Sequence, residues 1–267
     1  MGTPRTDRRT VLVTGATDGL GRALAAALAR AGHTVLVHGR DPERVLATAN
    51  EVGAARTYCA DFASLAEVHA LADDVLAHEP RLDVLVNNAG IGTNVPGDGE
   101  RMTSRDGHEL RFAVNYLAGY VLAERLLELL RHSAPARIVQ VSSAGQAPID
   151  FEDVMLERQY DGVQAYCQSK LAQVMHAIDL SERVDPAELT ANALHPATYM
   201  PTKIVASPVS TLEEGVEATL RLVIDPALDG VSGRYFNGTR EARANWQAYD
   251  SGDRRRLAEL STRLTYR

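Results

Sequence analysis

The sequence feature that most restricts the possible folds of this chain is a regular alternation. Short β-branched runs alternate with longer segments rich in alanine and leucine. The β-branched runs predict strands at residues 10–14, 34–38, 57–60, 82–86, 137–141, 190–194 and 233–236. The segments between them repeat apolar residues at helical spacing. We therefore expect an α/β fold: a doubly wound (Rossmann) parallel seven-stranded sheet with helices on both faces, whose ligands bind at the carboxyl ends of the strands.

The length of 267 residues suits a single domain of this kind, spanning residues 1–267. Two segments interrupt the alternation on the side of the sheet where ligands are expected. Residues 144–162 lose helical periodicity, and residues 195–214 open with a stretch, 195–210, that holds three prolines. We expect both segments to be excursions over the substrate, the second as a candidate lid.

Composition restricts the partners and the compartment. A net charge of −7 offers no broad basic face, so nucleic acid is not an expected partner. Only Cys59 and Cys167 are present, which fits a reducing compartment. The first ten residues lack the apolar run of a signal peptide, and no stretch approaches the ~18 apolar residues of a membrane span. We expect a soluble, cytoplasmic protein without a metal site, since the eight histidines show no ligand spacing.

A glycine-rich turn, residues 14–21, lies between the first strand and the first helix. In a dinucleotide site, the first glycine permits a tight turn, the second lets the backbone approach a pyrophosphate, and the third allows close helix packing. The sequence therefore predicts a dinucleotide site, and the alternative is a glycine-rich turn without a ligand. The expected contacts are Gly15, Thr17, Asp18, Gly19, Leu20 and Gly21.

Further cofactor contacts are expected after the next strands. No carboxylate ends the second strand, and Arg40 follows it instead, where a guanidinium can bind a 2′-phosphate. This favours NADP(H) over NAD(H), unless Arg40 is only a solvated residue at a helix start. Asp61, with Phe62 beside it, could accept a hydrogen bond from adenine, although a helix-capping or surface carboxylate is an alternative. The residues expected near the adenosine ribose are Asn88, Ala89 and Gly90.

Tyr166 and Lys170 are four residues apart on one predicted helix, so their side chains share a face. A phenol has a reference pKa of about 10, and an ammonium about 4 Å away would stabilise its anion by roughly 4 kcal/mol. Tyr166 could then exchange a proton with a substrate oxygen. Ser143, which ends the fifth strand, could hold that oxygen, although such serines are often turn formers. Asn115 lies in a helix that asparagine disfavours, which makes its amide a candidate for binding a water that links Lys170 to solvent.

Together these motifs resemble the short-chain dehydrogenase/reductase family. The matching pattern, in family order, is Thr14-Gly15-x3-Gly19-x-Gly21, Asp61, Asn87-Asn88-Ala89-Gly90, Asn115, Ser143 and Tyr166-x3-Lys170. The resemblance implies a Ser-Tyr-Lys-Asn tetrad. Ser143 would position the substrate and Tyr166 would act as acid and base. Lys170 would bind the nicotinamide ribose and lower the tyrosine pKa, while Asn115 would support a proton relay.

Two departures from the family pattern refine this comparison. Ser143 and Tyr166 are 23 residues apart, and this longer spacing is similar to the retinol-dehydrogenase-like and protochlorophyllide-reductase-like branches. At residues 195–197, His-Pro-Ala stands where the family commonly has Pro-Gly before a threonine that contacts nicotinamide. The candidate contacts there are Pro196 and either Thr198 or Thr202.

The sequence thus predicts an oxidoreductase that transfers a hydride between NADP(H) and a carbonyl or secondary alcohol, a ketoreductase acting on a moderately hydrophobic small molecule. Alternatives are C=C reduction or epimerisation on the same fold, and a catalytically silent dinucleotide-binding sensor or scaffold. Apolar residues that could form the substrate wall, or pack against the protein, are Ile149, Phe151, Met155, Tyr160, Tyr199, Met200, Ile204 and Val205. We interpret Cys167 and His195 as structural residues. Family members often associate through the helices that contain Asn115 and Tyr166, which implies a homodimer or homotetramer.

Overall fold

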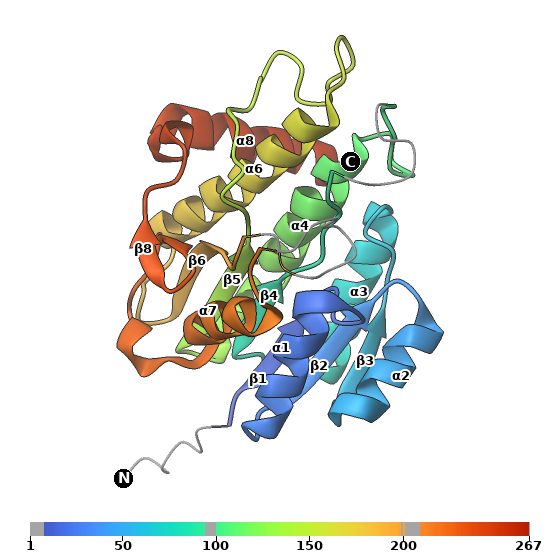
Figure 1. The fold of residues 1–267 in the computed structure, drawn as a ribbon, viewed down its shortest axis with the longest axis vertical. Coiled ribbons are helices and arrows are strands. Elements are labelled where there is room, and N and C mark those ends of the chain that lie inside the picture. The colour runs from blue at the N-terminus through green and yellow to red at the C-terminus, as the bar shows by residue number, and fades with distance from the viewer. Residues whose placement is uncertain (1–7, 94–99, 199, 201–208, 267) are drawn as a thin grey trace.

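The computed structural model describes residues 8–93, 100–198, 200 and 209–266, and its strands form one eight-stranded sheet. The strands are β1 (Thr10–Val13), β2 (Thr34–Gly39), β3 (Arg56–Cys59), β4 (Val84–Asn87), β5 (Ala136–Val141), β6 (Leu189–His195), β7 (Tyr235–Asn237) and β8 (Arg240–Ala242). Across the sheet they follow the order β3-β2-β1-β4-β5-β6-β7-β8 (Figure 1). Every neighbouring pair is parallel except β7 with β8. The chain therefore starts near the middle of the sheet and winds outward in both directions.

The predicted doubly wound α/β fold is confirmed, with one strand more than expected. β8 escaped prediction because its sequence, Arg-Glu-Ala, is short and polar, and because it pairs with β7 alone at the edge of the sheet. The strand order reverses between β1 and β4, so that the carboxyl ends of these two strands lie side by side. This reversal is the place where a doubly wound sheet binds its ligand.

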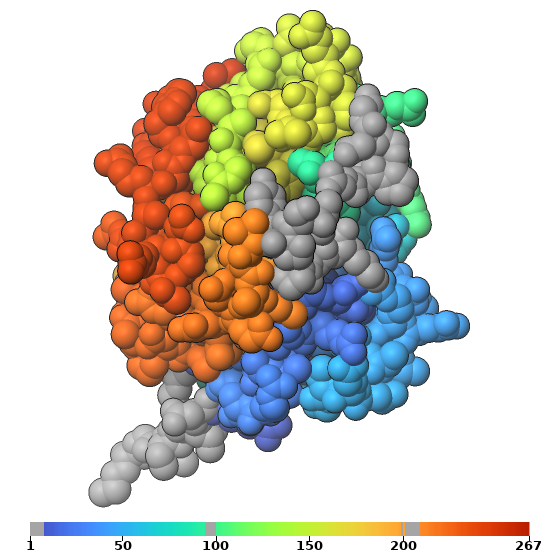
Figure 2. All heavy atoms as spheres, in the orientation of Figure 1, coloured from blue at the N-terminus to red at the C-terminus, as the bar shows by residue number. Residues whose placement is uncertain are grey.

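Helices cover both faces of the sheet, as expected. On one face lie α1 (Gly19–Arg30), α2 (Pro42–Val52) and α7 (Leu212–Ile224), and Figure 2 shows α1 and α7 side by side there. On the other face lie α3 (Leu65–His78), α4 (Ala118–Arg125) and α6 (Gly162–Arg183). β1 shows how one strand serves both layers, because Val11 and Val13 belong to the first apolar core and Leu12 belongs to the second.

The helix starts follow local signals. Asp41 accepts hydrogen bonds from the backbone at the start of α2, with Pro42 at the first helical position. Ser64 caps α3 in the same way. Thr211 and Glu214 form a capping box at the start of α7.

The apolar positions from Leu117 to Leu130 suit one long helix that ends before Pro135, but the structure does not contain such a helix. The chain instead forms a π-helix, η1 (Phe112–Leu117), followed by α4 and then by α5 (Leu127–His132). Between α4 and α5, Leu126 leaves helical geometry with φ −92° and ψ 2°, yet its side chain stays buried. The apolar pattern continues across this break, so the pattern does not indicate where the helix is interrupted.

The polar C-terminal segment, whose sequence suits only a weak helix, ends in a regular helix of 15 residues. After two short 3₁₀ turns, η2 (Pro226–Leu228) and η3 (Trp246–Tyr249), the chain forms α8 (Ser251–Thr265). This helix lies beside α6, and it contacts η1 and α4 through hydroxyls, with Ser261 Oγ 2.7 Å from the Tyr116 hydroxyl and Thr262 Oγ1 3.0 Å from that of Tyr120. Polar contacts of this kind weaken the apolar periodicity by which a helix is predicted. None of the described helices is long and apolar enough to span a bilayer.

Candidate active site

The glycine-rich turn forms a narrow cradle at the carboxyl end of β1. Gly15 adopts a positive φ of 63°, and a Cβ there would lie only 2.8 Å from Cα of Ala89. A Cβ at Gly21 would clash with the carbonyl oxygen of Gly15 and lie 2.5 Å from Nδ2 of Asn88. The backbone therefore approaches itself where a side chain would fill the cradle, and the start of α1 faces this space. This shape fits a pyrophosphate group.

Buried and partly buried hydrogen bonds join the turn to the loop after β4. The Thr14 hydroxyl accepts the backbone N–H groups of Asn88 and Ala89 at 2.9 and 3.0 Å and donates to the Val86 carbonyl. The Asn88 amide donates in return to the Thr14 carbonyl at 2.8 Å. The Asn88 side chain therefore holds the loop after β4 to the glycine-rich turn. Ala89 lies against Gly15.

Two arginines lie near the turn, one directly after β2 and one on α2. Arg40 is exposed immediately after β2, and no hydrogen bond or ion pair to it is found within the described part of the chain. Arg44, on the first turn of α2, donates to the Thr17 carbonyl and to the Asp18 carboxylate, both at 3.1 Å. Asp18 also caps α1 through the N–H of Gly19. Arg44 was not among the residues that the sequence indicated, although its position near the start of the predicted helix, four residues after Arg40, was an available signal.

Asp61 has a structural task of its own. One carboxylate oxygen accepts the N–H of Ala63 at 3.0 Å, and the other lies 3.6 Å from the Arg105 guanidinium. These contacts match the alternative of a capping or surface carboxylate. Phe62, next in the chain, is buried and stacks on the ring of His38 with centroids 4.3 Å apart. The buried Phe62 ring therefore anchors the loop after β3 on His38.

Lys170 and Tyr166 share a face of α6, as their spacing predicts. The Lys170 ammonium is buried, lies 5.7 Å from the centre of the Tyr166 ring, and donates to the Val141 carbonyl at 2.9 Å and to Gln173 Oε1 at 3.0 Å. Burial lowers the pKa of Lys170 to about 7, because the charged form is poorly solvated. Gln173 is an addition to the residues that the sequence indicated.

Ser143 lies next to Tyr166 at the end of β5. A Cβ placed on Gly145 would be 3.5 Å from Ser143 Oγ and 3.9 Å from Cε1 of Tyr166, so the two side chains border the same point. Ser143 Oγ accepts the N–H of Gly145 at 3.0 Å, which leaves its own hydrogen available for donation. The Ser143 carbonyl accepts both Gln146 Nε2 at 2.8 Å and the Tyr235 hydroxyl at 3.0 Å. No sequence signal pointed to Tyr235, which is 92 residues away.

Asn115 lies in the π-helix η1, a type of element that is frequent at functional sites. Its Oδ1 accepts the N–H of Ile91 at 2.8 Å, and its Nδ2 donates to the Ile91 carbonyl and to the Ser169 hydroxyl. A Cβ on Gly90 would lie 3.2 Å from Asn115 Oδ1 and 3.5 Å from Lys170 Nζ. Asn115 and Lys170 therefore meet at the loop after β4.

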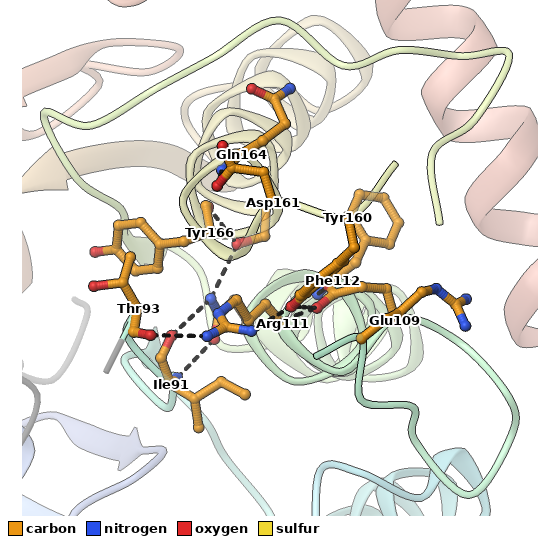
Figure 3. A network of polar contacts seen from close by, with 12 residues as sticks. Ile91, Thr93, Glu109, Arg111, Phe112, Tyr160, Asp161, Gln164 and Tyr166 are labelled. Atoms are coloured by element: carbon orange, nitrogen blue, oxygen red, sulfur yellow. Dashed lines mark hydrogen bonds and ion pairs between the residues drawn. The ribbon is translucent and has the colours of Figure 1, made fainter. Parts of the chain in front are cut away.

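A buried arginine one turn before Asn115 completes the support of this loop. Arg111 donates to the carbonyls of Gly92 and Thr93, both at 3.0 Å, and to the Tyr160 hydroxyl at 2.5 Å. Tyr160 in turn donates to the buried carboxylate of Glu109 at 3.2 Å. Figure 3 shows this network with Tyr166 in the same view. The network ties the segment after β4 to residues 144–162, and sequence reasoning missed both Arg111 and Glu109.

The excursion over residues 144–162 packs partly against the body of the protein. Ile149 is buried, and its backbone pairs with the side chain of Gln247 in η3. Phe151 and Met155 pack against the core at its surface. Three of the candidate wall residues are therefore packing residues at least in part, which is the alternative that the sequence left open.

The second excursion is described only in part. His195 Nε2 lies 3.1 Å from the Thr198 hydroxyl, which is exposed, and Pro196 is buried between them in the chain. Burial lowers the pKa of His195 and raises that of the Cys167 thiol. Among the other candidates here, Met200 is half-buried; the remaining ones, Tyr199, Thr202, Ile204 and Val205, fall outside the described residues. Within the described residues, no three His, Cys, Asp or Glu side chains are grouped as a metal site requires.

Comparison with known proteins decides the family. A family model described as short chain dehydrogenase matches residues 9–212. The chain belongs to the short-chain dehydrogenase/reductase family. This short-chain dehydrogenase/reductase is therefore an NAD(P)-dependent oxidoreductase.

Its relatives place it within the family. The short-chain dehydrogenase/reductase is 35% identical to retinol dehydrogenase 14 of Mus musculus, over 95% of this chain and 84% of the relative. It is 36% identical to a protein of Streptomyces sp. (strain C5) that carries the name of a daunorubicin C-13 ketoreductase, DnrU, over 95% of this chain and 91% of the relative. The RhlG/NADP active-site complex of Pseudomonas aeruginosa matches with a TM-score of 0.71 and 25% identity, over 86% of this chain and 94% of that chain. The resemblance to the retinol-dehydrogenase type is confirmed.

Proposed function

We propose that this enzyme catalyses reversible hydride transfer between NADP(H) and a carbonyl or secondary alcohol, as a ketoreductase acting on a moderately hydrophobic small molecule. The observation that carries the proposal is the position of Lys170 Nζ, 5.7 Å from the centre of the Tyr166 ring, with Ser143 bordering the same ring. A phenol, a cation and a hydroxyl around one point suit proton exchange with a carbonyl oxygen. The ketoreductase name of the Streptomyces relative points in the same direction.

Each tetrad residue has a proposed task. A bound nicotinamide would supply the hydride or accept it. Tyr166 would donate its proton to the substrate oxygen during reduction. Ser143 would donate its hydroxyl hydrogen to the same oxygen, because in its hydrogen bond with Gly145 the Ser143 Oγ only accepts. Lys170, when charged, would stabilise the tyrosinate. Asn115 would support the proton relay by holding the loop beside Lys170.

The proposed cofactor site follows the carboxyl edge of β1, β2, β3 and β4. The turn after β1 would hold the pyrophosphate, and Arg40 would bind a 2′-phosphate while Arg44 braces the turn. Two residues, Phe62 and Asn88, would act by supporting the chain around the cofactor. The full proposed set is Gly15, Thr17, Asp18, Gly19, Leu20, Gly21, Arg40, Asp61, Phe62, Asn88, Ala89, Gly90, Tyr166, Lys170, Pro196 and Thr198.

The change Tyr166→Phe tests the proposal. It removes only the proton-exchanging hydroxyl, so turnover of ketones should fall by about 10²–10⁴-fold while NADPH binding changes little. NADPH oxidation measured by absorbance with a panel of ketones gives the rate, and nicotinamide fluorescence gives the affinity. Tyr249→Phe, at a hydroxyl outside the tetrad, serves as the control. Undiminished turnover in Tyr166→Phe would refute the assignment.

The cofactor preference has a separate test. Removal of a charge-assisted hydrogen bond in Arg40→Ala should weaken NADPH about 10-fold or more and leave NADH unchanged. Arg30→Ala, at an exposed position at the end of α1, is the matched control. Equal effects on both cofactors would show that Arg40 does not read the 2′-phosphate.

The same assays separate the alternatives. NADPH binding without turnover of any carbonyl or alcohol would identify a sensor or scaffold. Turnover of activated alkenes alone would identify C=C reduction, and exchange of a C–H hydrogen with solvent at a stereocentre would identify epimerisation.

We further propose a cytoplasmic homodimer or homotetramer. The family resemblance implies contact through the helices that carry Asn115 and Tyr166, and α8 already packs on this region through Ser261 and Thr262. Assembly there would therefore bring α8 into the interface. A monomer mass in light scattering at about 10 μM, or recovery with membranes after cell fractionation, would contradict these proposals.

A further inference from the structure

His38, near the end of β2, is a buried side chain that the proposed reaction does not use. Its Nδ1 lies 3.3 Å from the backbone nitrogen of Gly15, and its Nε2 lies 3.1 Å from the carbonyl oxygen of Ala60. Gly15 follows β1 and Ala60 follows β3. The imidazole therefore joins the ends of the two strands that flank β2.

These two partners determine which nitrogen carries the hydrogen. The Gly15 N–H is a donor, so Nδ1 must accept, and the Ala60 carbonyl is an acceptor, so Nε2 must donate. Only the neutral ring satisfies both, because a protonated Nδ1 would face another N–H group. Burial acts in the same direction and lowers the pKa of His38 to about 4.

The rest of His38 also faces the two loops. Its carbonyl accepts the N–H of Ala16 at 2.8 Å, so side chain and backbone together hold two successive N–H groups of the glycine-rich turn. Its ring stacks on the ring of Phe62 at an interplanar angle of 18°. Phe62 directly follows Asp61 in the chain. One residue therefore fixes the start of the turn and the loop beyond β3 at the same time.

We propose that His38 is a positioning residue for the adenosine half of the cofactor. The inference rests on the proposed dinucleotide site. In that site, the turn at Gly15 would contact the pyrophosphate and the loop at Asp61 would contact the adenine, so the separation of the two loops must suit both parts of one ligand. The bridge from Gly15 to Ala60 through the imidazole sets this separation.

Three substitutions dissect the bridge. His38→Phe keeps a ring that can stack on Phe62 but loses both hydrogen bonds. His38→Asn places an amide oxygen close to the position of Nδ1, and His38→Gln can place an amide nitrogen near that of Nε2. His33→Phe is the matched control, because the His33 Nδ1 also accepts a backbone N–H, from Arg9, at the opposite end of β2.

Binding of three probes to the folded variants tests the inference: NADPH, adenosine 2′,5′-bisphosphate and reduced nicotinamide mononucleotide. Circular dichroism shows which variants are folded. His38→Phe should bind NADPH and the adenosine bisphosphate about 10-fold more weakly, while the mononucleotide is unaffected. His38→Asn and His38→Gln should each recover part of the loss, and His33→Phe should match the wild type.

Two results would overturn the inference. One is wild-type affinity for the adenosine bisphosphate in any folded variant that lacks both hydrogen bonds. If His38→Phe does not fold, wild-type affinity in both amide variants has the same meaning. The other is an equal loss for the nicotinamide mononucleotide, which would indicate general loosening. A wild-type protein that binds none of the probes would instead refute the proposed function, and this inference with it.

Discussion

Two opposing influences act on Lys170. Burial disfavours its charged form, and two acceptors inside the protein, the Val141 carbonyl and Gln173 Oε1, favour it. Burial lowers the pKa of Lys170 to about 7, which implies that the proposed electrostatic support of Tyr166 changes near neutral pH. Since the two groups interact, the pKa values seen in kinetics belong to the pair.

Gln173→Leu should shift this balance. Without the Oε1 acceptor, the pKa of Lys170 falls further, and the alkaline limb of the kcat/KM profile for ketone reduction should move about one pH unit lower. Profiles measured from about pH 5 to 9 would show the shift. Gln173→Asn tests for partial rescue, and Gln164→Leu, earlier on α6, is the control. An unmoved limb with only a lower kcat would assign Gln173 a purely structural role.

At the scale of elements, Arg111 connects η1, the segment after β4 and residues 144–162. Arg111→Leu leaves the Gly92 and Thr93 carbonyls and the buried Glu109 carboxylate without this partner. Breaking a buried ionic network in this way costs about 3–5 kcal/mol in the free energy of unfolding. Urea denaturation would measure the loss, and Arg158→Leu, at an exposed ion pair, should cost less than about 1 kcal/mol. Similar losses in both variants would contradict the role assigned to Arg111.

Elements with local causes were predictable from the sequence. The strands of the sheet interior have continuous apolar runs, and the caps at Asp41, Ser64 and Thr211 act on N–H groups two or three residues away. The network of Arg111 depends on Tyr160, 49 residues distant, and no periodicity encodes such a pairing. The π-helix around Asn115 was likewise hidden, because its apolar pattern suits an ordinary helix.

The same distinction applies to the site. Thr14, Gly15, Tyr166 and Lys170 were predictable because turn chemistry or a four-residue spacing identifies them. Arg44, Gln173 and Tyr235 support those residues from positions that only the folded chain brings near. Sequence patterns thus indicated the groups proposed to react, and the structure was needed for the groups that hold them.

At the scale of the whole molecule, His38 makes the free energy of unfolding depend on pH. Its pKa is lowered from 6.5 to about 4 by burial, so the unfolded chain binds a proton that the folded protein excludes. The sign follows directly: above about pH 6.5 the effect is absent, and between about pH 6.5 and 4 the free energy of unfolding falls, by about 3 kcal/mol in total.

Denaturation with urea at several pH values between about 7 and 4 would measure this loss. His195, whose pKa is also lowered by burial, acts in the same direction, so the difference between wild type and His38→Asn isolates His38. The variant should be less stable at neutral pH and lose less stability on acidification. Parallel pH dependences would exclude His38 as a source of acid sensitivity.

The close approach of Gly21 to Gly15 and Asn88 has a consequence for directed evolution of cofactor use. Even a methyl group at position 21 would collide with two segments of backbone and side chain that are themselves held by Thr14. Gly21 therefore tolerates no larger residue at the floor of the proposed site, whereas Arg40 lies exposed on its rim. Selection for a different nicotinamide nucleotide should accumulate changes at the rim and leave Gly15 and Gly21 untouched.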